Sequence, residues 1–156
     1  MTTPASTPPA APPSPPEVPT RRVDSALLLL RVITGVVFLA HGAQKIFTFG
    51  IPGVAESFSG MGIPLAGTAA PLVSFAELLG GIALALGLLT RTAAGVLAVV
   101  MLGALLLVHF PSGFFLPQGY EFVLVLLTIL VSLLLAGPGA WSIDAGLKRR
   151  RSAPRR

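Results

Sequence analysis

Residues 68–110 of the chain read TAAPLVSFAELLGGIALALGLLTRTAAGVLAVVMLGALLLVHF. Only Thr90 and Arg91 separate two apolar stretches, Thr68–Leu89 and Thr92–Phe110. At a rise of ~1.5 Å per residue, either stretch is long enough to cross the ~30 Å hydrocarbon core of a bilayer as a helix. A two-residue connection between such helices makes the chain turn back at once. The sequence therefore predicts a tight antiparallel helical hairpin inside a membrane.

Two further apolar stretches meet the same criterion, Ala26–Phe47 before this hairpin and Tyr120–Ala136 after it. Of the 156 residues, 53% are hydrophobic and only 11% are charged, whereas about 25% are charged in an ordinary soluble domain. This composition argues against a soluble enzyme. We predict an all-α fold, in which residues 23–147 form an integral membrane antiparallel four-helix bundle. The loop segment Gly53–Met61 should add a short helix with Val54, Phe58 and Met61 on one face.

The two ends of the chain differ from this predicted domain. Residues 1–20 contain eight prolines, a density that prevents regular secondary structure. We predict that residues 1–22 are a disordered Pro-rich cytoplasmic tail, interpreted as a spacer in preference to a polyproline recognition motif. Residues 148–156 are expected to form a basic cytoplasmic tail. Its charge should draw it to the anionic head groups of membrane lipids, an interpretation we favour over nucleic-acid binding.

The distribution of positive charge predicts how the chain is oriented. If the four stretches all span the bilayer, one side receives almost all the basic residues near the helix ends and the other side receives only Lys45. The residues on the first side are Arg21, Arg22, Arg91, Lys148, Arg149, Arg150, Arg151, Arg155 and Arg156. Because cytoplasmic loops carry the excess of Lys and Arg, we expect a multi-pass protein of the bacterial plasma (inner) membrane with both termini in the cytoplasm.

The residue inventory limits the chemistry that the chain can perform. It contains no cysteine and two histidines, so thiol nucleophiles, disulfides and iron–sulfur centres with cysteine ligands cannot come from this chain. Two histidines cannot form a three-histidine metal site. We therefore expect no metal or thiol centre.

Ionisable residues inside the apolar stretches are the best candidates for a site, because a charge in a span costs ~2.5–3.5 kcal/mol or more. Arg31, His41 and Lys45 recur at helical spacing along one face of the first stretch. Helix side chains lean toward their own N-terminus. On antiparallel neighbours, Lys45 and Glu77 should therefore lean toward each other in the outer, periplasmic half of the bilayer. The predicted polar cluster from all four helices consists of His41, Lys45, Glu77, His109 and Glu121.

Two interpretations of this cluster are open. In the first, Lys45–Glu77 and His109–Glu121 are neutralising pairs that only fix helix packing. In the second, which we favour, the cluster lines an outward-opening pocket for a small polar or quinone-like head group. Intramembrane acids and histidines commonly relay protons. Catalytic residues cannot be assigned from the sequence.

Three more charged residues have expected structural roles. Arg31 lies close enough to the inner boundary for its long side chain to reach the interface. Arg91 marks the cytoplasmic turn and thus the topology. Asp144, beyond the last stretch, should either pair with the basic tail or cap a short segment.

Three motifs occur in order along the chain. The first is Arg31…Gly35…Phe38…His41-Gly42…Lys45, and the second runs from Glu77 through Gly80-Gly81 to Gly87–Ala94. The third is Gly137-Pro-Gly-Ala-Trp-Ser-Ile-Asp144. Together they closely resemble the DoxX family of small bacterial membrane proteins over residues 24–147. The matching charged and histidine positions are Arg31, His41, Lys45, Glu77, Arg91 and Asp144.

The resemblance implies a four-helix inner-membrane protein. Relatives are named for a subunit of a thiosulfate:quinone oxidoreductase, so it also implies a membrane subunit of a redox system. Electron transfer would then need a bound quinone or a partner subunit that carries the redox centre. The alternative is a non-catalytic membrane scaffold or interaction protein, and a small-solute transporter is the least favoured function. Whether the protein is an enzyme, and whether it forms a homo-oligomer, stay open at this point.

Overall fold

The computed structural model describes residues 20–152, so residues 1–19 of the tail predicted over 1–22 and the last four residues of the chain lie outside the described part. The described chain is helical. Its elements are α1 (Thr20–Ala43), the π-helix η1 (Gln44–Phe49), α2 (Gly50–Gly60), α3 (Ala66–Leu86), α4 (Thr90–Ala104), the π-helix η2 (Leu105–His109), the short 3-10 helix η3 (Phe110–Ser112), α5 (Glu121–Ala136) and α6 (Ile143–Ser152). This confirms the all-α helical bundle.

Three continuous helical segments are long and apolar enough to cross a membrane, namely Thr20–Gly60, Ala66–Leu86 and Thr90–Ser112. The fourth predicted stretch corresponds to the shorter apolar helix Glu121–Ala136. The short loop helix expected over Gly53–Met61 is present as α2, with Val54 buried.

Two predicted boundaries need correction. The first helix starts at Thr20, within the tail predicted to be disordered over residues 1–22 and before the apolar stretch that begins at Ala26, because residues 20–25 contain no helix breaker and Asp24 accepts a hydrogen bond from the Ala140 N–H. The hairpin turn is Gly87–Leu89 and not Thr90–Arg91. Helix α3 ends where Gly87 adopts a left-handed φ of 69°, a backbone conformation that glycine reaches without steric cost.

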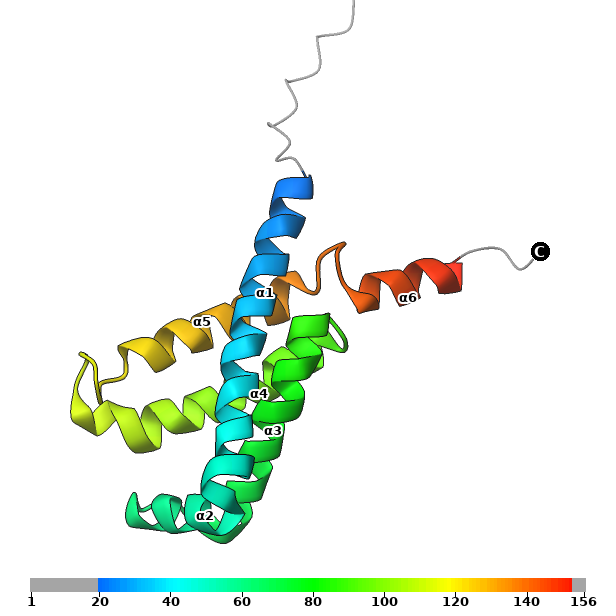
Figure 1. Ribbon diagram of the computed structural model, residues 1–156. Coiled ribbons are helices and arrows are strands. Elements are labelled where there is room, and N and C mark those ends of the chain that lie inside the picture. The colour runs from blue at the N-terminus through cyan, green and yellow to red at the C-terminus, as the bar shows by residue number, and fades with distance from the viewer. Residues whose placement is uncertain (1–19, 153–156) are drawn as a thin grey trace, which may run out of the picture.

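The tightest packing is between α1 and α3, which run side by side (Figure 1). Three glycines permit this approach. A Cβ on Gly35 would lie 2.7 Å from the Gly81 carbonyl oxygen, and one on Gly42 would lie 2.7 Å from Leu78 Cα. Gly81 in turn faces the backbone of Leu39. Such backbone-to-backbone contact at small residues is the usual way in which membrane helices pack.

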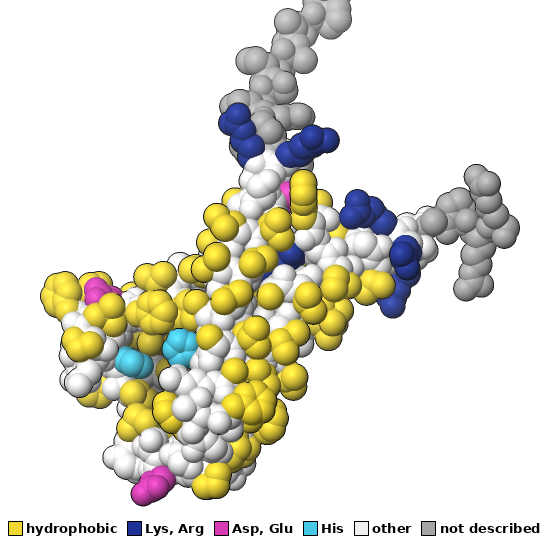
Figure 2. Space-filling view, in the orientation of Figure 1, with side chains coloured by type: hydrophobic (Ala, Val, Ile, Leu, Met, Phe, Trp, Pro, Cys, Tyr) yellow, Lys and Arg dark blue, Asp and Glu magenta, His cyan; other side chains and the backbone are white. Residues whose placement is uncertain are grey.

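Helices α4 and α5 form a second pair, and the two pairs share one apolar core. Phe38, Leu84, Leu97, Leu130 and Leu133 are buried where the pairs cross. Away from α6 the pairs diverge, and α2 folds back beside α3 at the far end of the first pair (Figure 1). The divergence leaves a hollow in the molecular surface, in which both histidines are visible (Figure 2). That hollow positions the site.

Candidate functional site: a polar-walled pocket between two helix pairs

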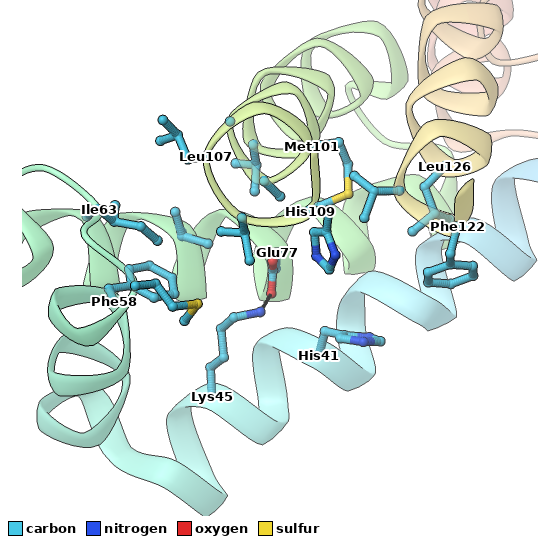
Figure 3. Close-up of a pocket in the computed structure, with 18 of the residues that line it drawn as sticks. His41, Lys45, Phe58, Ile63, Glu77, Met101, Leu107, His109, Phe122 and Leu126 are labelled. Carbon is cyan, nitrogen blue, oxygen red and sulfur yellow. Dashed lines mark hydrogen bonds and ion pairs between the residues drawn. The ribbon is translucent and has the colours of Figure 1, made fainter. Parts of the chain in front are cut away.

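A pocket of about 670 Å³ fills the space between the diverging helix pairs. Four of the five predicted cluster residues line it: His41, Lys45, Glu77 and His109. They come from the continuous segment α1–η1, from α3 and from η2, three parts of the chain that are far apart in the sequence (Figure 3). The volume lies within the ~300–1,000 Å³ typical of small-molecule sites. The expected meeting of these four side chains at one pocket is present in the structure.

Lys45 and Glu77 form the polar centre of the pocket wall. Lys45 Nζ donates a hydrogen bond to Glu77 Oε2 within an ion pair. Glu77 is almost wholly buried, whereas the Lys45 side chain keeps 19% of its surface exposed. The contact agrees with the opposite leanings expected for side chains on antiparallel helices. It leaves one side of the ammonium group facing the cavity (Figure 3).

The two histidines make the same kind of hydrogen bond. His41 Nδ1 lies 2.9 Å from the Val37 carbonyl oxygen, and His109 Nδ1 lies 2.9 Å from the Gln118 carbonyl oxygen. A carbonyl can only accept, so Nδ1 is the donor in each ring. A neutral imidazole with its proton on Nδ1 leaves Nε2 as an acceptor. Each ring therefore has a defined orientation and one nitrogen available to a ligand.

Both π-helices border this pocket, and nothing in the sequence pattern indicated them. Lys45 lies in η1, while Leu107, Val108 and His109 lie in η2. A π-helical turn widens the helix and changes the direction of its side chains, and such turns occur frequently at functional sites. Here they bring Lys45 and His109 to the cavity. Hydrophobic periodicity has no signal for one inserted residue, which explains why sequence reasoning missed them.

Glu121 does not belong to the pocket, contrary to the interpretation that placed it in the cluster. Its Oε1 accepts a hydrogen bond of 2.8 Å from the Leu116 backbone N–H, within the loop that precedes α5. Within residues 20–152 the only ion pair is Lys45–Glu77, so the suggested His109–Glu121 pair does not form. The reason is local: Glu121 satisfies a loop N–H, and His109 is held by the carbonyl of Gln118.

The rest of the pocket wall is apolar. Phe58 comes from α2, Met61 and Ile63 from the following loop, and Phe122 and Leu126 from α5. Phe58 and Ile63 lie on one side of the polar wall, and Phe122 and Leu126 lie on the other (Figure 3). The sequence indicated Phe58 and Met61 only as one face of a short helix, and Phe122 and Leu126 only as parts of a span. A pocket with one polar wall and apolar remaining walls suits an amphipathic ligand.

Arg31 has a different role from the one expected. Its side chain is 1% exposed and does not extend to the interface. The guanidinium instead donates to the carbonyl oxygens of Pro138 and Trp141, each at 2.7 Å. Arg31 thus ties α1 to the segment that joins α5 to α6. The sequence could not show this contact because it joins residues more than a hundred positions apart.

Arg91 and Asp144 hold the same end of the molecule together. Arg91 Nη2 donates to the Leu135 carbonyl oxygen at 3.2 Å, linking the start of α4 to the end of α5. Asp144 accepts hydrogen bonds from the N–H groups of Leu89 and Thr90, at 2.8 and 2.9 Å. It therefore caps the N-terminus of α4. The expectation was a cap on a short segment or a pairing with the basic tail; the capped element is instead α4, and no ion pair joins Asp144 to the tail residues 148–152 that the structure describes.

These contacts perturb the acidity of the Asp144 carboxyl group. Burial alone raises its pKa, but the backbone N–H donors of Thr90 and Leu89, together with the charge of Arg31, outweigh burial. The pKa of Asp144 is consequently held below its usual range. The lowered pKa favours the ionised form, which accepts both hydrogen bonds of the cap.

Within residues 20–152, no group of three or more His, Asp or Glu side chains is arranged to hold a metal ion. The chemistry that the pocket itself supplies is hydrogen bonding and proton exchange. The ammonium group of Lys45 offers N–H donors within a neutral ion pair, and the histidines offer ring nitrogens beside an apolar cavity.

Comparison with known proteins places this architecture in a family. The chain is 35% identical to the uncharacterized membrane protein Rv3486 of Mycobacterium tuberculosis, over 82% of this chain and 85% of that protein. It is 35% identical to the inner membrane protein YqjF of Escherichia coli, over 81% of this chain and 95% of that protein. It is also 33% identical to the "Putative oxidoreductase CatD" of Bacillus subtilis, over 68% of this chain and 76% of that protein.

No solved structure matches the chain. The family model named DoxX matches residues 26–110. This range covers α1 to α4 and includes His41, Lys45, Glu77 and His109, the four polar residues of the pocket wall. Together with the helical membrane architecture and the three relatives, this match shows that the chain belongs to the DoxX family.

Proposed function

We propose that the protein is a membrane component of a redox system that binds a quinone-like ligand in the pocket between the two helix pairs. The observation that carries the proposal is the composition of that pocket, in which Lys45, Glu77 and two histidines form one wall and apolar side chains form the others. A ring with polar oxygens would lie against the polar wall. Its apolar substituent would lie against Phe58, Phe122 and Leu126.

The cost of the ion pair supports a binding role. Bringing a lysine and a glutamate into a membrane-embedded wall costs several kcal/mol per ion before their attraction is counted. Packing of α1 on α3 does not depend on it, because the contacts at Gly35, Gly42 and Gly81 already fix that interface. The printed name of one relative, "Putative oxidoreductase CatD", agrees with a redox setting and with electron transfer through a bound quinone or a partner subunit.

A scaffold without a ligand is the second candidate, and the ion pair itself favours it. Lys45 and Glu77 neutralise each other across two helices, as a pair that only secured the register would do. The two functions differ in whether the cavity is occupied in the membrane. The test must therefore detect a ligand directly.

The test introduces a large side chain into the cavity and measures whether the protein then loses a bound ligand. Ala104 lines the pocket, whereas Leu106, two residues further on, is 56% exposed and does not. We expect mass spectrometry of the gently purified protein to find a bound quinone or similar amphiphile, to lose most of it in Ala104→Phe and to retain it in the control Leu106→Phe. Finding no ligand in the wild type, or equal amounts in both variants, would contradict the proposal and favour the scaffold.

A further inference from the structure

The free hydrogen-bonding atoms of the pocket wall are not equivalent. His41 and His109 use Nδ1–H on the carbonyls of Val37 and Gln118. The hydrogen bonds formed within residues 20–152 therefore leave Nε2 of each ring free, and in a neutral ring Nε2 only accepts. Where lipid replaces water, an unpaired acceptor is costly. The two histidines thus favour a ligand that donates hydrogen bonds.

Lys45 provides the complementary group. Its ammonium has three N–H donors, and Glu77 Oε2 is the acceptor that it contacts. The donors that remain can reach a ligand oxygen in the cavity, since Lys45 lines the pocket. The wall therefore presents both a donor and two acceptors to whatever oxygen atoms a ligand brings (Figure 3).

A hydroxyl group and a carbonyl group of a ligand would form different hydrogen bonds with this polar wall. A hydroxyl group accepts from Lys45 and also donates to a histidine Nε2, whereas a carbonyl oxygen accepts from Lys45 and leaves the histidines unpaired. We infer that the pocket binds the hydroxyl-bearing, reduced form of a quinone more tightly than the oxidised form, through His41 Nε2 and His109 Nε2. This inference rests on the proposed function and specifies which form of the ligand the site selects.

The same geometry implies that acid reverses the preference. The titratable groups that face the pocket are His41 from α1, Lys45 from η1, Glu77 from α3 and His109 from η2, while α2, α4 and α5 contribute only uncharged lining residues. Of these four, histidine is the one that ordinarily changes charge between about pH 5 and pH 8. Protonation converts Nε2 from an acceptor into a donor. A ligand carbonyl oxygen can then accept hydrogen bonds from these donors, whereas the proton of a ligand hydroxyl group finds no histidine nitrogen to accept it.

The experiment uses the full chain in lipid nanodiscs and three probes: decylubiquinol, decylubiquinone and the dimethyl ether of decylubiquinol. Affinity is measured by equilibrium partition between loaded and empty nanodiscs without oxygen. At about pH 8 we expect the quinol to bind roughly tenfold more tightly than the quinone and the ether, the factor that one or two hydrogen bonds provide. At about pH 5 the quinone should bind at least as tightly as the quinol.

Variants assign the effect to the histidines. In the double variant His41→Leu, His109→Leu, the ratio of quinol to quinone affinity should fall to about one at both pH values. His109→Gln should retain part of the preference, because the amide oxygen of glutamine can accept near the position of Nε2. Glu121→Gln is the control, because Glu121 does not line the pocket and glutamine keeps an oxygen that can accept from the Leu116 N–H, so its ratio should equal that of the wild type.

The outcomes separate this inference from the function on which it rests. If quinone and quinol bind equally at about pH 8, or if the ratio does not depend on pH, the histidine assignment is wrong while the quinone site stands. If no probe binds to the wild type above the level of empty nanodiscs, the proposed function fails as well. The wild-type measurements decide both points even where a histidine variant does not fold.

Discussion

At the residue scale, Asp144 shows how one side chain can hold together segments that are remote in the sequence. It lies in the first turn of α6 and caps α4, and its own N–H donates to the Gly87 carbonyl oxygen at 2.9 Å. A capping acid is worth about 1 kcal/mol when replaced by a residue without an acceptor. The lowered pKa of Asp144 means that this stabilisation is present above the unfolded-state pKa of about 3.9 and is lost as the pH falls through the lower folded-state value.

We therefore expect Asp144→Ala to lower the free energy of unfolding by about 1 kcal/mol near pH 7, and to lower it less as the pH falls below about 4. Thermal unfolding in detergent, followed by circular dichroism at several pH values, measures the difference from the wild type. Glu56→Gln is the control, because Glu56 is exposed on α2, and it should leave the melting temperature unchanged. A difference for Asp144→Ala that stays constant down to pH 3 would show that the carboxylate charge does not contribute.

At the scale of elements, the contact between α1 and α3 is set by glycines whose neighbours are backbone atoms. A Cβ on Gly81 would lie 2.7 Å from the Gly35 carbonyl oxygen, and backbone cannot move aside as a flexible side chain can. A methyl group must therefore push the helices apart. Because Lys45 and Glu77 lie on opposite sides of the same interface, any separation of the helices also weakens the ion pair.

Gly81→Ala should destabilise the protein by about 1–3 kcal/mol, the usual cost of overpacking. Gly103 in α4 is the matched control, since a Cβ there meets nothing within 4 Å. Gly103→Ala should be neutral or stabilising by up to about 1 kcal/mol, because alanine favours a helix more than glycine does. Melting temperatures of the two variants in one detergent provide the comparison. Equal melting temperatures would mean that the α1–α3 interface is not close-packed in the membrane.

At the scale of the whole molecule, the two ends of the protein differ in charge. The basic side chains of Arg21, Arg22 and α6 gather at one end, and the pocket lies toward the other (Figure 2). Helix α6 runs across the direction of α1 (Figure 1). Trp141, Ile143 and Leu147 are exposed beside the basic residues of α6, an arrangement typical of a helix at a membrane interface.

The expected orientation places this basic end in the cytoplasm and the pocket toward the outside. The absence of native cysteine allows a direct check with single-cysteine variants. Ser112→Cys, at the exposed end of η3, should react with a membrane-impermeant maleimide added to intact cells. Ser152→Cys, at the end of α6, should react only after the membrane is permeabilised. The opposite labelling pattern would invert the topology and place the pocket in the cytoplasmic half.

The helical membrane fold could be predicted from the sequence alone, and so could the arrangement in which polar side chains of different helices face one another. Apolar stretches long enough to cross a bilayer leave helices as the available structure, and helical periodicity together with side-chain direction was enough to predict that Lys45 and Glu77 meet. Four residues of the polar wall followed from the same reasoning, because a charge within an apolar span must find a partner.

The hydrogen-bond partners of Glu121, Arg31 and Asp144 could be found only in the folded protein. The same is true of the apolar residues that line the remaining walls of the pocket. Glu121 satisfies a nearby N–H in its loop, and Arg31 satisfies carbonyls more than a hundred positions away. A buried donor or acceptor pairs with whichever partner the packing of the helices brings near to it. Neither the hydropathy of the sequence nor the spacing of its residues specifies that partner. The same holds for the two π-helical turns, whose inserted residue leaves no periodic signal yet brings Lys45 and His109 to the cavity.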